Sequence, residues 1–187
     1  MSLAKNRHLT AEEYLKGESE ADIKHEFISE EIWAMVGASD AHVTIALNLA
    51  AALKEKLKGS PCRTYISDMK VSVEQADAFF YPDVFVTCDA RDKKNDLYKE
   101  HPLFIAEVLS PSTEAFDRGR KFSIYRQLES LLDYWLIDIE KRFIDSFERL
   151  DNGDWVLRSY SERDESAVIR SLDIKLPVAA IYDEVMG

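Results

Sequence analysis

The stretch Leu103–Leu109 (LFIAEVL) is the most hydrophobic strand candidate in this chain, and it carries one carboxylate, that of Glu107. A run that is apolar on both faces is typical of a strand buried inside a sheet. Strand alternation places Glu107 on the same face as Ile105 and Leu109. An ionised glutamate there is costly unless it is paired, hydrogen-bonded or bound to a cation. Glu107 is therefore a candidate metal ligand or catalytic residue, and a structural glutamate paired with an arginine or lysine is the alternative.

A second carboxylate lies upstream, at the start of another apolar strand candidate, in residues 81–86 (YPDVFV). Pro82 cannot donate a backbone hydrogen bond, so it favours a strand start or a bulge at Asp83. Taken alone, Asp83 is typical of a solvated aspartate at a strand end. Together with Glu107 on a neighbouring strand, it is also a candidate metal ligand, and the sequence leaves both interpretations open.

A helix predicted from about residue 114 to 128 follows the central strand. One stripe of this helix carries Asp117, Lys121, Ile124, Tyr125 and Leu128, so Lys121 is expected to face the core. An exposed salt bridge between Asp117 and Lys121 is the alternative, and it would contribute little to stability. An inward lysine, held by Asp117, would instead orient a water or stabilise a pentavalent phosphate.

Two carboxylates and a lysine on adjoining elements are the components of a metal-dependent phosphodiesterase site. Carboxylate oxygens suit Mg²⁺, which keeps several waters and bridges to a substrate phosphate. The metal lowers the pKa of a bound water and offsets charge on the phosphate oxygens. We therefore expect Mg²⁺ (or Mn²⁺) as cofactor, with Asp83 and Glu107 as its ligands and Lys121 as the third catalytic residue.

Two further side chains are auxiliary candidates beside Asp117. His42 lies on the apolar face of a helix expected from Ser39 to about Leu57, where a hydrogen-bonded core histidine is the alternative interpretation. Glu26 would supply a third carboxylate from a short strand, but the sequence does not fix the face on which it lies.

The remaining pattern predicts a mixed α/β (α+β) class, with a mixed sheet flanked by helices rather than a strict βαβ repeat. Because no linker rich in glycine, serine or proline divides the chain, we expect one domain over residues 1–187. Further strands are expected at 24–29, 31–36, 62–66, 69–73, 79–87, 134–138, 142–150 and 155–160, and helices at about 11–15 and 177–185.

The overall charge weakens the case for a nucleic-acid partner without excluding it. The chain has 35 acidic and 24 basic residues and a formal net charge of −11, which repels a phosphate backbone. Residues 54–63 nevertheless carry a local charge of +3, and the region around 118–126 is mildly basic. A basic rim beside the carboxylates is therefore compatible with the sequence.

The sequence also predicts a compartment and a redox state. No apolar stretch approaches transmembrane length and the N-terminus lacks the apolar core of a signal peptide, so we expect a cytoplasmic protein without membrane association. Cys62 and Cys88 are isolated from each other and from any histidine at metal-ligand spacing. Two reduced thiols are therefore expected rather than a disulfide.

Several of these stretches together resemble the Uma2 family of restriction endonuclease-like proteins. The resemblance covers about residues 8–185 and implies the PD-(D/E)XK nuclease fold, a mixed sheet with flanking helices, for which a homodimer is plausible. It is carried by YPDV at 81–84, by EVLSPST at 107–113 with the spaced Asp117, Lys121 and Tyr125, and by YWLID at 134–138.

The chain departs from this pattern at two places. In the parent superfamily a lysine follows the acidic ligand by two residues on the same strand, and that position is Leu109 here. The resemblance implies that Lys121 on the helix takes over the lysine function. A turn glycine is commonly expected at Glu30-Glu31, beside Glu26.

Three functions remain open from the sequence. The first is a Mg²⁺-dependent nuclease that hydrolyses nucleic-acid phosphodiester bonds. The second is a catalytically inactive nuclease-fold module that binds a protein or nucleic-acid partner, as the acidic surface and Leu109 suggest. The third is an acidic scaffold in which Glu107 merely pairs with Lys121.

Overall fold

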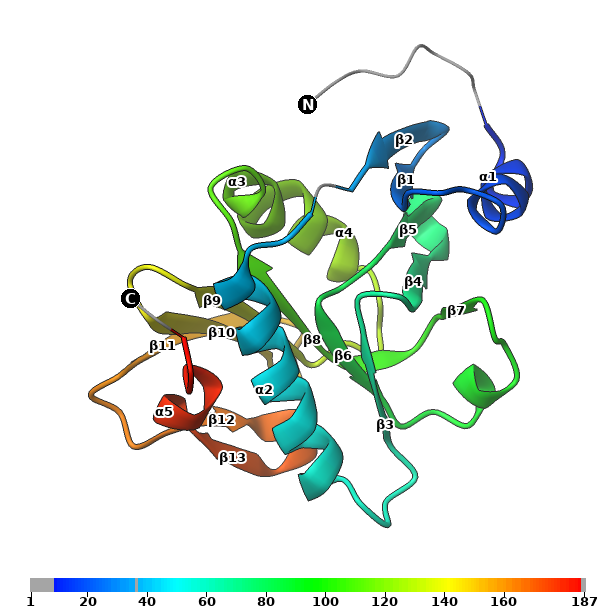
Figure 1. The fold of residues 1–187 in the computed structure, drawn as a ribbon. Coiled ribbons are helices and arrows are strands. Elements are labelled where there is room, and N and C mark those ends of the chain that lie inside the picture. Colours follow the sequence, from blue (N-terminus) through cyan, green and yellow to red (C-terminus); the bar gives the residue numbers. More distant parts are fainter. Residues whose placement is uncertain (1–8, 36, 186–187) are drawn as a thin grey trace.

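A computed structural model describes residues 9–35 and 37–185 and contains a mixed six-stranded sheet at its centre (Figure 1). β8 pairs antiparallel with β6 on one side and parallel with β9 on the other, so the predicted central strand is confirmed. The strand order is β11-β10-β9-β8-β6-β3. The strands are β3 (Arg63–Ile66), β6 (Val84–Thr87), β8 (Pro102–Leu109), β9 (Asp133–Asp138), β10 (Phe143–Arg149) and β11 (Trp155–Ser161).

Two smaller sheets complete the β structure. One has five strands in the order β2-β1-β5-β4-β7, and the other is the hairpin of β12 and β13. The strands are β1 (His25–Ile28), β2 (Glu31–Ala34), β4 (Lys70–Val73), β5 (Ala78–Phe80), β7 (Tyr98–Lys99), β12 (Ser166–Ile169) and β13 (Ile174–Pro177). The mixed α+β class expected from the sequence is therefore confirmed.

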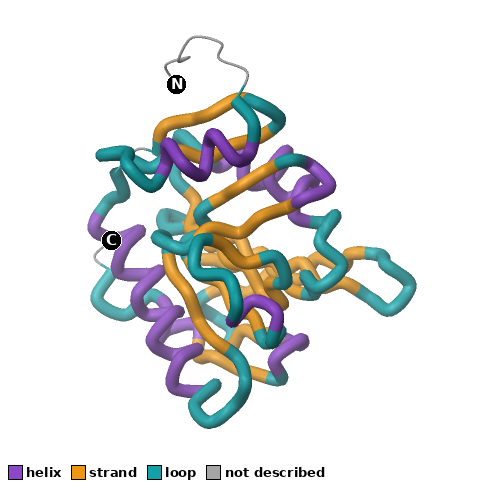
Figure 2. Tube along the Cα trace, turned by 90° about the vertical axis from the view of Figure 1, so that its right-hand side faces the viewer, coloured by secondary structure: helices purple, strands orange, loops and turns teal. Residues whose placement is uncertain are grey.

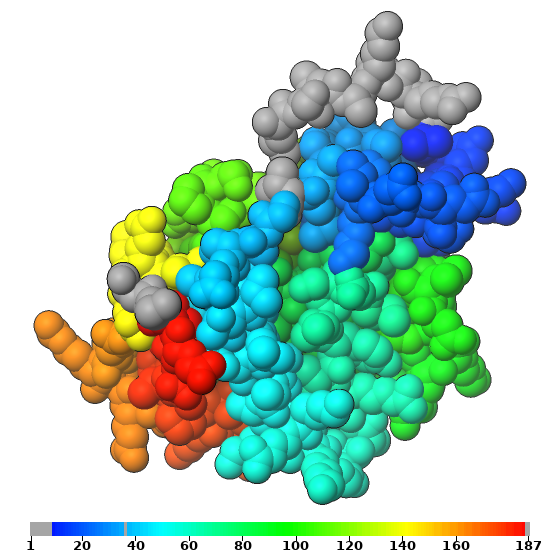
Figure 3. Space-filling model, in the orientation of Figure 1, coloured from blue at the N-terminus to red at the C-terminus, as the bar shows by residue number. Residues whose placement is uncertain are grey.

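The long helix α2 (Asp40–Lys56) lies on one side of the strands, as Figure 2 shows by the purple helix at its left. Ser39 caps it by accepting a hydrogen bond from the backbone N–H of His42, as the sequence predicted. In Figure 3 the cyan residues of α2 run down the front of the molecule beside the red C-terminal segment. Asn48 joins the two, because its amide donates to the carbonyl oxygens of Ile181 (3.2 Å) and Asp183 (2.8 Å).

The other helices are shorter. α1 is Ala11–Glu18, and α5 is Val178–Ile181, shorter than the predicted 177–185. α3 (Glu114–Phe116), a π-helical turn (Asp117–Lys121) and α4 (Phe122–Tyr125) follow one another in the predicted helix 114–128, which therefore ends earlier than expected. Within the described ranges, no helix is long and apolar enough to cross a membrane.

Two apolar clusters cover the two faces of β8. Phe104, Ala106 and Val108 pack in a cluster that includes Leu49 of α2. The alternate residues Ile105 and Leu109 pack in the other cluster, which includes aromatic residues of the 114–128 region. Glu107 therefore belongs to the face covered by that helical segment, as strand alternation predicted.

The sequence treated residues 79–87 as one interrupted strand, and the structure divides them between two sheets. β5 ends at Phe80 in the five-stranded sheet, and β6 begins at Val84 in the six-stranded sheet. Pro82 lies in the link, where its missing N–H removes no ladder hydrogen bond. Asp83 therefore lies at the junction of the two sheets. The predicted strand 31–36 ends at Ala34, and Val36 lies outside the described residues.

The turn between β1 and β2 explains the expectation of a glycine at Glu30-Glu31. Ser29 (φ 47°) and Glu30 (φ 73°) both have left-handed backbone conformations. A two-residue hairpin turn with two positive φ angles favours glycine, since other side chains pay a steric cost there. This chain builds the hairpin with a serine and a glutamate instead.

The prediction of two reduced thiols is wrong, because Cys62 and Cys88 form a disulfide. Arg63 of β3 pairs with Thr87 of β6, so the two cysteines follow directly at the next position of the antiparallel register. The sequence separation of 26 residues gave no indication of this proximity. The bond ties the edge strand β3 to β6.

Candidate active site

The register of β6 and β8 brings the two predicted carboxylates together. Val84 pairs with Ala106, so Asp83 and Glu107 face each other at the next position of the antiparallel pair. The backbone N–H of Asp83 donates to Glu107 Oε2 at 3.4 Å, and that of Val108 donates to Asp83 Oδ2 at 2.8 Å. These bonds orient the carboxylates at the point where β6 begins.

Lys121 points inward to these carboxylates. Its side chain is 6% exposed, and its Nζ lies 2.9 Å from Glu107 Oε1, 2.9 Å from Glu26 Oε1 and 3.6 Å from Asp117 Oδ1. Asp117 and Lys121 are both buried, so the alternative of an exposed salt bridge between them is wrong.

The π-helical turn gives Lys121 its position. Residues 117–121 form a wider turn than an α-helix, and turns of this kind frequently mark functional sites. Within it, the carbonyl oxygen of Asp117 accepts a hydrogen bond from the hydroxyl of Tyr134 at 3.1 Å. This buried contact anchors the turn to β9 of the central sheet.

His42 joins the site from the first turns of α2. Its Nε2 lies 2.9 Å from Asp83 Oδ1, and both side chains are 15% exposed. Asp83 thus has one oxygen facing the imidazole and the other facing the N–H of Val108. His42 is thus a largely buried, hydrogen-bonded histidine, as the alternative interpretation expected, and its partner is a predicted site residue.

Glu26 comes from β1, which belongs to the other sheet. Besides its contact with Lys121, its Oε1 accepts a hydrogen bond from the backbone N–H of Tyr81 at 3.4 Å. The structure therefore settles the face of Glu26 that the sequence left open. The cluster joins residues of both large sheets.

Tyr125 adds a further contact to the cluster. The hydroxyl of Tyr125 donates to Glu107 Oε1 at 3.2 Å. Burial raises the pKa of Tyr125 well above its ordinary value, so the hydroxyl keeps its proton. The predicted stripe placed Tyr125 on the same helix face as Lys121, but it did not predict the hydrogen bond to Glu107.

The cluster carries an excess of negative charge. Three carboxylates contact the Lys121 ammonium and Asp83 lies opposite Glu107, so three negative charges are in excess when all four are ionised with His42 neutral. Burial raises the pKa of Glu107 well above its ordinary value; Lys121 opposes this effect, whereas Asp83, Asp117 and Glu26 add to it. Burial lowers the pKa of Lys121, but its carboxylate neighbours outweigh burial and raise it overall. Lys121 therefore remains an ammonium.

This donor set fits a divalent cation that prefers oxygen. Among residues 9–35 and 37–185, no group of three or more His, Cys, Asp and Glu side chains is arranged to hold a metal ion. Mg²⁺ needs fewer protein ligands, because one or two carboxylates suffice when waters and phosphate oxygens complete its shell. The excess charge and the raised pKa of Glu107 both indicate that added positive charge would stabilise the ionised cluster.

Leu109 occupies the position where the resemblance places the usual lysine. It is 5% exposed and packs in the same apolar cluster as Tyr125 and Leu128. No charge therefore comes from this position of β8, and the ammonium in contact with Glu107 comes from the helical segment.

Comparisons with known proteins agree with this fold. Two uncharacterized Synechocystis proteins are similar to the chain: slr1290 is 37% identical over 174 residues (93% of this chain and 91% of that protein), and sll1609 is 33% identical over 159 residues (84% and 90%). A crystal structure described as a "putative nuclease belonging to DUF820" from Anabaena variabilis has a TM-score of 0.76. At 16% identity it covers 93% of this chain and 97% of its own, and it shows the same fold. Residues 11–179 match the family described as "Uma2: Putative restriction endonuclease". The chain therefore belongs to the Uma2 family of restriction endonuclease-like proteins.

Proposed function

We propose that this protein is a Mg²⁺-dependent phosphodiesterase of the nuclease type, which hydrolyses phosphodiester bonds of nucleic acid. The observation that carries the proposal is the convergence of Asp83, Glu107 and the Lys121 ammonium on one cluster. Family membership supports the reaction class.

Each residue has a distinct role in this proposal. Asp83 and Glu107 hold the cation through their carboxylate oxygens. Bound Mg²⁺ supplies a Lewis acid for the phosphate oxygens and lowers the pKa of a water. Lys121 donates a hydrogen bond to the attacking water or to a phosphate oxygen. Because its pKa is raised, Lys121 acts as a charged donor and not as a proton acceptor.

Three neighbours position these groups. Glu26 and Asp117 keep the Lys121 ammonium in place when the cation occupies Glu107. His42 fixes Asp83 through the Nε2–Oδ1 contact. Glu26 of β1 and Asp117 of the π-helical turn hold the Lys121 ammonium without a lysine at the position of Leu109 on β8. This arrangement supports a catalytic role for Lys121.

The second candidate function is an inactive module that keeps the nuclease fold and binds a partner. Two observations favour it: the apolar side chain of Leu109 and the net charge of −11. Unlike the proposed nuclease, this module requires no metal ion.

The test combines cleavage with metal binding. The purified protein is incubated with Mg²⁺ or Mn²⁺ and end-labelled DNA and RNA, both single-stranded and duplex. We expect cleavage that Asp83→Asn reduces to the metal-free background. Asp151→Asn, in the exposed β10–β11 turn, is the matched control and keeps the wild-type rate.

Two results would overturn the assignment. Cleavage by Asp83→Asn at the wild-type rate removes Asp83 from the reaction. Absence of both cleavage and any heat of Mn²⁺ binding at millimolar concentration identifies the inactive module instead.

A further inference from the structure

A tryptophan lies next to the charged cluster. Trp33 of β2 pairs directly with Glu26 of β1, and residues directly opposite in an antiparallel pair share one face of the sheet. Glu26 in turn contacts Lys121 at 2.9 Å. Trp33 packs against the apolar cluster that contains Tyr125, but part of its surface remains exposed. The exposed part of Trp33 therefore lies beside Glu26, which contacts the proposed catalytic ammonium of Lys121.

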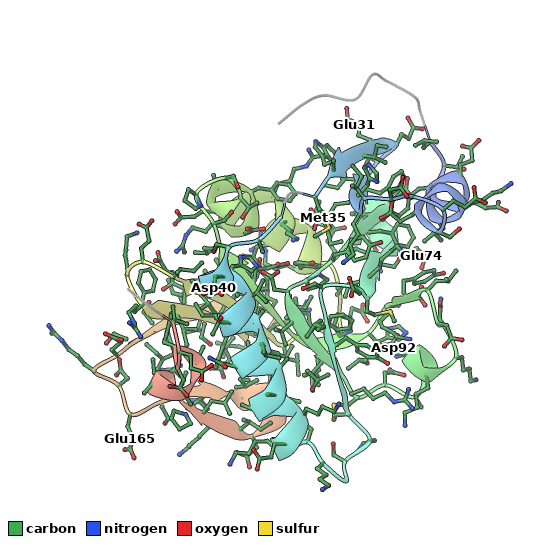
Figure 4. All side chains as sticks on the ribbon, in the orientation of Figure 1. Glu31, Met35, Asp40, Glu74, Asp92 and Glu165 are labelled. Carbon is green, nitrogen blue, oxygen red and sulfur yellow. A yellow bond between two sulfur atoms is a disulfide. The ribbon has the colours of Figure 1, made fainter. Side chains whose placement is uncertain are left out.

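An arginine of the helical segment contacts the same tryptophan. Arg120 precedes Lys121 in the π-helical turn, is exposed, and places its Cζ 5.7 Å from the centre of the Trp33 ring. Figure 4 labels Glu31 and Met35, which flank Trp33 along the chain, and shows the helical segment next to this strand.

The two arginines of this turn are used differently. Arg118 contacts Glu114 (2.8 Å) and Asp145 (2.7 Å), so its charge is neutralised within the fold. Over residues 9–35 and 37–185, Arg120 contacts the Trp33 ring and forms no ion pair with a carboxylate. Its guanidinium charge therefore remains available beside the site.

An indole and an available guanidinium have a defined chemical preference. Bases of single-stranded nucleic acid stack on aromatic rings and on guanidinium planes, whereas paired bases keep both faces covered within the duplex. A net charge of −11 also disfavours binding that depends on tracking a long phosphate backbone. Stacking next to the cation site would supply affinity without an extended basic surface.

From this arrangement we propose that Trp33 and Arg120 form a stacking platform for an unpaired nucleobase adjacent to the scissile phosphate. The inference rests on the proposed nuclease function and names its substrate class, which is single-stranded nucleic acid. Trp33 and Arg120 bind substrate, whereas Asp83, Glu107 and Lys121 act at the phosphate.

Binding is tested by fluorescence anisotropy with a labelled 12-nucleotide single strand and with the same strand in a duplex. Ca²⁺ serves as the oxygen-seeking cation during the titrations, and gels verify that the strand stays intact. We expect the single strand to bind at least about tenfold more tightly than the duplex. Loss of one stacked base corresponds to about 5- to 140-fold in affinity, which is the weakening expected for Trp33→Leu.

Two variants make the result specific. Trp33→Phe keeps an aromatic ring and should retain most of the affinity. Arg120→Ala should weaken single-strand binding, whereas Arg126→Ala should not. Arg126 is the matched control, because it is exposed on the same helical segment and lies 5.3 Å from the Phe122 ring, away from Trp33.

Intrinsic fluorescence gives a readout that a purely structural role would not change. Stacking of a base on Trp33 should quench its emission, and Trp33→Phe should remove that quenching. Equal affinity of Trp33→Leu and wild type for the single strand, or equal affinity of wild type for duplex and single strand, overturns the platform.

The outcomes for the two proposals are separate. Cleavage that requires Asp83 but is indifferent to Trp33→Leu refutes the platform and leaves the nuclease function intact. Single-strand binding that requires Trp33, without any metal-dependent cleavage, refutes the nuclease function and leaves the platform as a binding site.

Discussion

Lys121→Met is expected to destabilise the protein, because it removes the ammonium that lies between Glu26 and Glu107 while keeping an unbranched chain of similar length. The side chains of Lys121 and Glu107 are only 6% and 4% exposed, so water cannot replace the lost partner. Removing one member of a buried ion pair costs about 3–5 kcal/mol. In a domain of this size, such a loss corresponds to a decrease in Tm of roughly 6–20 °C.

The loss should depend on pH in a defined direction. The pKa of Lys121 is raised by its carboxylate neighbours, so its stabilisation is complete at neutral pH and disappears only as pH rises through that elevated value. In Lys121→Met the unpaired carboxylates must take up protons to remain buried. The difference in unfolding free energy between variant and wild type should therefore shrink as pH falls from 7 towards 5.

Urea unfolding at several pH values measures this difference, with two controls. Lys141→Met removes a lysine that is 65% exposed and pairs with Asp138 at 3.5 Å, and it should change stability by less than about 1 kcal/mol. Combining Lys121→Met with Glu107→Gln should cost less than Lys121→Met alone, because no unpaired carboxylate remains at that position. A Lys121→Met variant within about 1 kcal/mol of wild type at pH 7 would refute the buried-pair argument.

Three further perturbations probe other parts of the molecule. Because burial and neighbouring carboxylates raise the pKa of Glu107, protons compete with a cation for this carboxylate, so Mn²⁺ affinity should increase with pH; calorimetry in buffers of different ionisation enthalpy should detect proton release, and Glu107→Gln should abolish it. Replacing Cys62 and Cys88 by serine opens a loop of 26 residues and should lower the unfolding free energy by about 3.5 kcal/mol, whereas unchanged urea midpoints would contradict a stabilising bond. Leu49→Ala removes a fully buried side chain and should cost about 2–5 kcal/mol, while the control Val43→Ala, 55% exposed, should stay within about 0.5 kcal/mol; equal losses would contradict the packing of α2.

The sequence predicted the parts of the site that depend on local pattern. The apolar run around Glu107 predicted that both faces of β8 are buried, and strand alternation predicted the correct face for Glu107. The helical stripe predicted an inward Lys121 beside Asp117. These features follow from the periodicity of one element, so they need no knowledge of its neighbours.

The parts that the sequence did not predict depend on contacts between distant elements. Glu26 lies on a four-residue strand, too short for alternation to fix its face, and its orientation follows from pairing with β2 and β5. The Cys62–Cys88 bond follows from the register of β3 and β6, which spacing along the chain does not reveal. The hairpin of β12 and β13 was missed as well.

The widened turn at 117–121 also makes the site sensitive to chain length. A π-helical turn holds about one residue more than an α-helical turn, so deletion of Gly119 would let this segment close as an ordinary α-helix, with Asp117 and Lys121 three residues apart instead of four. The flanking residues Phe116 and Phe122 would keep their places in the apolar cluster, whereas Asp117 and Lys121 would lose their present positions beside Glu107. A loop tolerates such a shortening by adjusting its path. In this segment, by contrast, the number of residues determines where Lys121 meets the carboxylates.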